Sequence, residues 1–167
     1  MSDEIVNRVA NSVLITFDLE DFYVPGDRVK VDLSQWLEQG FVLREKEFRT
    51  AITSFNWSIY KDCYVALFCS TDAILPAWAS LLITAQLNPV TKQIVWGSLQ
   101  DLEHQIFAKA IDELDLSSFE SKPVIVKGCS EKQIPESAFV YLIQKLQPVV
   151  KSLFYGEACS SVPLFKK

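Results

Sequence analysis

The sequence predicts an α/β fold with a mainly parallel sheet flanked by helices. Three observations support this prediction: strand-like apolar runs alternate with amphipathic helical stretches, one β-α-β unit occurs twice, and 49% of the 167 residues are apolar, with only 22% charged. Strands that alternate with helices favour right-handed crossovers and parallel pairing. The length is that of one ordinary domain, so residues 1–167 are predicted to form a single α/β domain.

Residues 1–60 are predicted to add strands and helices to the N-terminal side of that sheet. The expected elements are a strand at 13–18, a strand at 29–31 after the turn Pro25-Gly26, a short helix that Gly40 ends, and a helix at 41–55. No linker rich in glycine or serine separates this segment from the rest.

The remainder of the chain alternates strands with helices. The expected strands are 64–69, 94–96, 124–127 and 153–155, and the expected helices are 76–87, 98–114 and 135–146. The run at 64–69 (YVALFC) is apolar almost throughout, which is typical of a strand buried on both faces.

An internal duplication is visible within these elements. Residues 76–97 align without gaps on residues 135–156 at an offset of 135 − 76 = 59, with seven identical pairs that include Pro76/Pro135 and Gly97/Gly156. The predicted repeats extend over 63–97 and 123–156.

Composition excludes several classes of function. The net charge is −5, which argues against a nucleic-acid binder. The apolar runs are far shorter than the ~20 residues of a membrane span, and the acidic start Met1-Ser2-Asp3-Glu4 is unlike a secretory signal. We therefore expect a cytoplasmic protein without a membrane partner, and its single histidine disfavours catalysis that depends on histidine.

Three cysteines share one sequence context. Cys69, Cys129 and Cys159 each precede a serine and each lie at or just past the end of a predicted strand. Cys63, in contrast, begins a strand-like run and is interpreted as a packing residue. Because ligands bind at the carboxyl ends of parallel strands, we expect the three thiols to converge on one sheet edge.

Three converging thiols are typical of a metal site. Thiolates suit zinc or iron, and four-coordinate zinc accepts three cysteines and one further ligand. The candidates for the fourth ligand are Glu103, His104, Asp72, Glu157 and water.

Two alternatives remain at this point. A cysteine before a helix N-terminus has a lowered pKa, so Cys69 or Cys129 could serve a thiol-dependent enzyme or a sulfur carrier. Alternatively, the cysteines pack at strand ends and the serines cap helices, and the protein is a non-catalytic interaction module.

Four stretches resemble an uncharacterised family of Bacteroidetes, domain of unknown function 2480. They are residues 7–23, 73–78, 127–137 and 147–164, the last (QPVVKSLFYGEACSSVPL) being the most specific. The resemblance implies a small cytoplasmic α/β protein in which Cys69, Cys129, Cys159 and the pair Leu102-Glu103 match the family pattern, which favours Glu103 as the fourth ligand. It also implies a link to iron-sulfur or sulfur metabolism and to iron-sulfur assembly proteins as partners, but no established activity.

Overall fold

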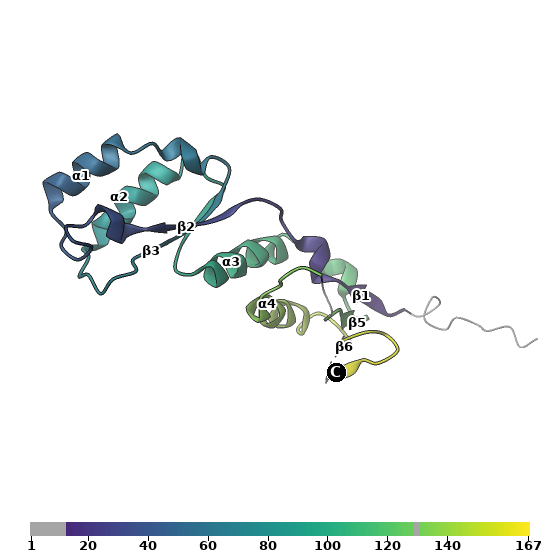
Figure 1. The fold of residues 1–167 in the computed structure, drawn as a ribbon. Helices are drawn as coiled ribbons and strands as arrows, with labels where there is room; N and C mark the ends of the chain where they lie inside the picture. Colours follow the sequence, from purple (N-terminus) through teal and green to yellow (C-terminus); the bar gives the residue numbers. More distant parts are fainter. Residues whose placement is uncertain (1–12, 129–130) are drawn as a thin grey trace, which may run out of the picture. The chain divides into compact units, whose positions relative to one another are not determined.

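The computed structural model describes residues 13–128 and 131–167, which form two compact units (Figure 1). Residues 25–105 form what we call the inserted unit. The outer unit is built from the chain on either side of it, residues 13–24 and 106–167. Each unit contains its own sheet.

The inserted unit has a parallel three-stranded sheet in the order β2-β3-β4. Its elements are β2 (Arg28–Asp32), η2 (Leu33–Trp36), α1 (Glu45–Ser54), η3 (Trp57–Tyr60), β3 (Tyr64–Phe68), α2 (Ala77–Leu87) and β4 (Gln93–Trp96). Helices α1 and α2 pack on the sheet face formed by Val31, Val65 and Leu67, and these residues form one core.

The outer unit has a four-stranded sheet in the order β1-β5-β6-β7. Its elements are β1 (Ile15–Phe17), η1 (Leu19–Phe22), η4 (Leu116–Phe119), β5 (Pro123–Val126), α4 (Glu136–Leu146), β6 (Ser152–Tyr155) and β7 (Val162–Lys166). Strands β1, β5 and β6 are parallel, and β7 is antiparallel to β6. Helix α3 (Leu99–Asp112) crosses the chain boundary between the units at residues 105 and 106.

The two units repeat the same local structure at the offset of 59 residues. The backbone N–H of Asp62 donates to the carbonyl of Val90, and that of Ser121 donates to Val149. Asp62 and Ser121 both have positive φ, at 60° and 57°. Residues other than glycine seldom adopt a positive φ. Its recurrence at both positions therefore indicates equivalent turns, beyond the general similarity of any two β-α-β units.

The equivalence extends upstream of the segment that aligns in sequence. Phe48 and Ile52 of α1 are fully buried, and so are Phe107 and Ile111 of α3, again 59 residues later. Both pairs belong to the cores of their units. The second half of α3 therefore packs in the core of the outer unit as α1 packs in the core of the inserted unit.

The predicted α/β fold with mainly parallel strands is confirmed, but the strands are divided between two sheets where the sequence led us to expect one. The reason is that β1 pairs with β5 while β2 pairs with β3, so each copy of the repeat completes a sheet of its own. The helix expected at 41–55 begins only at Glu45, and strand β7 was not foreseen.

Candidate functional site

The cysteines singled out by the sequence follow strands of different sheets. Cys69 comes directly after β3 of the inserted unit, and Cys159 lies in the turn after β6 of the outer unit. Cys129 lies outside the described residues. Since β3 and β6 belong to separate sheets, the edge that all three cysteines were expected to share does not exist.

The carboxyl edge of the outer sheet gathers charged side chains. Lys127, which follows β5, lies 3.2 Å from the Asp18 carboxylate at the end of β1. Hydrogen bonding and attraction from Asp18 raise the pKa of Lys127, and the carboxylates of Glu157 and Glu20 add to this effect. Neither Asp18 nor Lys127 is among the site residues that the sequence predicts. The available signal was a lysine that closes an otherwise apolar strand.

The end of β5 approaches the end of β6 closely. Val126 pairs with Tyr155, and the Tyr155 hydroxyl donates to the Gly128 carbonyl at 3.4 Å. A Cβ at position 128 would clash with the Tyr155 ring, so a side chain there would require the ring to move. Tyr155 therefore ties the loop after β5 to the end of β6.

Cys159 is exposed in a short turn of the same unit. The Ser160 N–H donates to the Glu157 carbonyl at 2.9 Å and closes this turn. Because it is exposed, this thiol is open to metal ions and to small reagents.

The equivalent edge of the inserted unit is built differently. One carboxylate oxygen of Asp32 accepts from the N–H groups of Ser34 and Ser70, at 2.9 and 3.0 Å, and the two serine hydroxyls lie 3.1 Å apart. Burial raises the pKa of Asp32, but the hydrogen bonds from Ser70 and Ser34 outweigh it and lower the pKa to about 2. These groups satisfy one another and tie the loop after β2 to the loop after β3.

Cys69 belongs to this hydrogen-bonded edge. Its half-buried thiol lies 3.4 Å from the Thr71 hydroxyl, which in turn donates to the Gly40 carbonyl at 2.6 Å. Cys63 is buried in the core, as expected for a packing residue. Burial, together with the charges of Asp27 and Asp62, raises the pKa of the Cys63 thiol.

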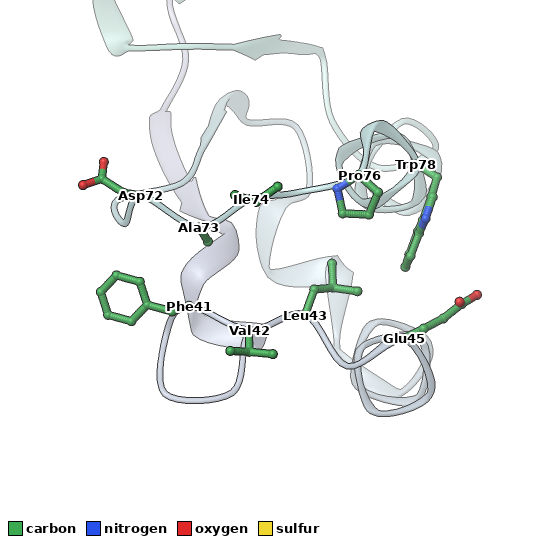
Figure 2. A pocket seen from close by; sticks show the side chains of 9 residues that line it. All are labelled: Phe41, Val42, Leu43, Glu45, Asp72, Ala73, Ile74, Pro76 and Trp78. Atoms are coloured by element: carbon green, nitrogen blue, oxygen red, sulfur yellow. The ribbon is translucent and has the colours of Figure 1, made fainter.

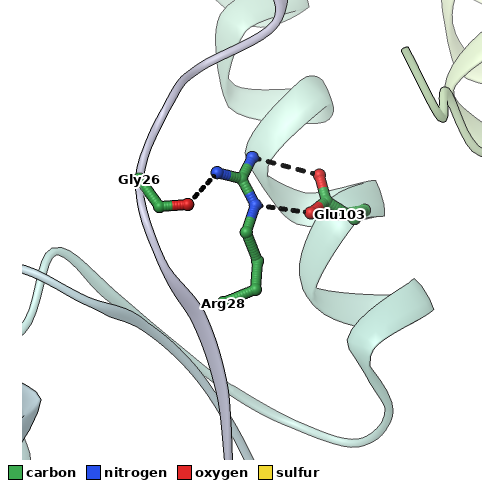
Figure 3. A network of polar contacts seen from close by, with 3 residues as sticks. All are labelled: Gly26, Arg28 and Glu103. Atoms are coloured by element: carbon green, nitrogen blue, oxygen red, sulfur yellow. Dashed lines mark hydrogen bonds and ion pairs between the residues drawn. The ribbon is translucent and has the colours of Figure 1, made fainter.

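Glu103, the favoured fourth ligand, has another partner in the structure. Both of its carboxylate oxygens accept from the Arg28 guanidinium, at 2.6 and 3.3 Å, while Arg28 also donates to the Gly26 carbonyl (Figure 3). The Arg28 guanidinium stacks over the Tyr64 ring, 5.1 Å from its centroid. This arrangement fastens the first turns of α3 to the sheet of the inserted unit. It also gives Glu103 a structural role, and its neighbour His104 is half-buried on the same helix.

Within residues 13–128 and 131–167, no group of three or more histidine, cysteine, aspartate or glutamate side chains is placed to hold a metal ion. Among the same residues no helix has the length and apolar character needed to cross a membrane.

Comparison with known proteins adds a family but no activity. No curated protein and no solved structure matches the chain significantly. The family described as "Protein of unknown function (DUF2480)" matches residues 3–167. Because this match covers essentially the whole chain, the protein belongs to that family.

Proposed function

We propose that the protein binds a zinc or iron ion at the carboxyl edge of the outer sheet, with the thiolates of Cys129 and Cys159 as ligands. The observation that carries the proposal is the parallel pairing of β5 with β6, in which Val126 lies opposite Tyr155. Cys129 comes 129 − 126 = 3 residues after the first of these residues, and Cys159 comes 159 − 155 = 4 residues after the second.

The spacing is compatible with shared ligation. Neighbouring strands lie ~4.8 Å apart, and zinc–thiolate bonds of ~2.3 Å place two ligating sulfurs about 3.8 Å apart. Loops of three and four residues from adjacent strand ends are long enough to bridge that difference. The contact between Tyr155 and Gly128 supports this, because it holds the two strand ends together just before the cysteines.

The charged groups of this edge support an ion site as well. Glu157 offers carboxylate oxygens, which zinc and iron accept beside thiolates. Lys127 carries a positive charge among them, and a neighbouring cation favours the deprotonated form of a thiol.

The proposal omits two residues that the sequence favoured. Cys69 follows a strand of the other sheet and its thiol contacts Thr71, and the carboxylate of Glu103 is held by Arg28. Because Cys69 comes after β3 as Cys129 comes after β5, it serves as a matched control for the loss of a thiol.

The test is elemental analysis of untagged protein purified without chelator. We expect about one zinc or iron ion per chain, lost in Cys129→Ser and in Cys159→Ser and retained in Cys69→Ser. Loss of the metal in Cys69→Ser alone, or metal-free wild-type protein, would overturn the proposal. A metal lost equally in all three variants would instead favour the site of three cysteines expected from the sequence.

The wider roles rest on the resemblance to the family and stay predictions. They are a place in iron-sulfur or sulfur metabolism, with iron-sulfur assembly proteins as partners. Metal-free protein in which Cys129 alone reacts rapidly with an alkylating reagent would favour the alternative of a thiol-dependent enzyme or sulfur carrier.

A further inference from the structure

The inserted unit carries an apolar groove that the proposed metal site does not use. Its walls are the segments 41–45 and 72–78, which face each other across a volume of about 530 Å³ (Figure 2). Phe41, Val42 and Ile74 line the groove and expose 57%, 48% and 96% of their surface. Large apolar side chains grouped at such exposure are typical of a binding surface.

Hydrogen bonds order the two loops that lead into the walls of the groove. The N–H of Glu38 donates to the Val42 carbonyl at 2.8 Å and the N–H of Val42 donates back at 3.1 Å, across a turn in which Gln39 has φ of 51°. The Thr71 hydroxyl donates to the Gly40 carbonyl and joins the loops that carry the two walls. A groove ordered before binding loses less entropy when a partner enters.

The internal duplication shows that one of these apolar positions, Ile74, is polar in the other copy. Segment 72–78 corresponds to 131–137 at the offset of 59, and both keep the proline that precedes the helix. Ile74, however, corresponds to Gln133, so the same position is polar in the other copy. Two further apolar positions of the wall, Ala73 and Trp78, correspond to Lys132 and Ser137.

The charge of the groove specifies the partner further. Glu45 and Asp72 lie at its ends (Figure 2). Glu45 accepts from Arg49 at 2.9 Å, whereas Asp72 forms no ion pair with the described part of the chain. An exposed carboxylate at one end of an apolar groove complements a basic residue beside apolar ones.

We propose that this groove docks a short peptide segment of a partner protein, in which apolar side chains stand next to a lysine or arginine. The apolar side chains contact Phe41, Val42 and Ile74, and the basic side chain pairs with Asp72. This inference is independent of the proposed metal site, which lies on the sheet edge of the outer unit.

The test is selection from a displayed library of random short peptides on the full-length protein. We expect enriched peptides to combine apolar residues with an adjacent lysine or arginine. Ile74→Gln should weaken the best peptide about tenfold through lost apolar contact, and Asp72→Asn about threefold, with the latter effect vanishing at high salt. Leu81→Gln is the matched control, because Leu81 is 64% exposed on α2 and does not line the groove.

Three results would overturn the inference. The first is that the wild-type protein enriches no more peptides than the Ile74→Gln protein does. The second is that Leu81→Gln weakens peptide binding as much as Ile74→Gln does, and the third is that the enriched peptides are acidic. Because Ile74 is almost fully exposed and its counterpart is already glutamine, the Ile74→Gln protein is expected to fold normally.

Discussion

The ion pair between Arg28 and Glu103 is predicted to stabilise the fold rather than to serve a metal. The side chains are only 12% and 21% exposed, and two hydrogen bonds join them. A charge-assisted hydrogen bond contributes about 1.5–3 kcal/mol to the free energy of unfolding when it is shielded from solvent, and far less when it is exposed to water. Since the pair is partly exposed, we expect a coupling free energy of about 2 kcal/mol in a cycle of Arg28→Ala, Glu103→Ala and the double variant.

Urea denaturation followed by tryptophan fluorescence measures this coupling. The control is the pair Arg44–Glu38, which has a similar distance of 2.7 Å but side chains that are 62% and 50% exposed. Its coupling should be much smaller, because both side chains are largely exposed to solvent. Equal coupling in the two cycles would refute the argument from burial. Loss of bound metal in a folded Glu103→Gln protein would restore Glu103 as a ligand.

Two further predictions follow from the strand-end contacts. Asp32→Asn should lower the free energy of unfolding at pH 7 by about 1 kcal/mol. The reason is that the pKa of Asp32 is about 2 in the folded protein and 3.8 in the unfolded chain, and the value is discounted for solvent exposure. The difference from wild type should shrink as the pH falls from about 4 to 2 and the native carboxylate is protonated, and a difference unchanged at pH 2 would contradict it. Gly128→Ala should destabilise the outer unit by about 2 kcal/mol in thermal denaturation, because the Cβ of the alanine would meet the Tyr155 ring. Adding Tyr155→Leu to this variant should relieve most of the effect.

The sequence predicts the strands well because burial is a local signal. The run at 64–68 is buried at four consecutive positions, and the apolar run at 124–126 behaves in the same way. The partners of these strands are not local. β1 pairs Phe17 with Val126, 126 − 17 = 109 residues later, and no periodic pattern records that pairing.

The same limit applies to the candidate site. The sequence shows that the cysteines lie at strand ends. Whether those strands share one sheet depends on the strands with which β1 and β2 pair, and the sequence does not show this. Glu103 shows the difficulty most clearly, since its partner Arg28 is 75 residues away and lies on an edge strand. A carboxylate next to a histidine on a helix gives no local sign that an arginine already holds it.

The duplication separates what the fold requires from what distinguishes the two units. Asp18 and Asp32 cap the short helices η1 and η2 in the same way, each accepting a backbone N–H two residues later. The groups that meet these two carboxylates differ: Lys127 pairs with Asp18 in the outer unit, whereas the N–H groups of Ser34 and Ser70 donate to Asp32 in the inserted unit. The outer edge therefore carries an ion pair and, after β6, the exposed thiol of Cys159, whereas the loops of the inserted edge are joined by hydrogen bonds to Asp32.

This difference predicts how the thiols respond to a chelator. In protein as purified, a metal ion held by Cys129 and Cys159 should slow their alkylation. Removing the ion should accelerate both reactions, because a thiolate released from a metal reacts quickly. Cys69 should react at one intermediate rate with or without chelator, since its half-buried thiol contacts Thr71, and Cys63 should react slowest because burial raises its pKa. Mass spectrometry of the alkylated peptides measures all four rates in one sample. Acceleration of Cys69 to the same extent would mean that the metal is shared between the cysteines of both units, and the site restricted to the outer sheet would be wrong.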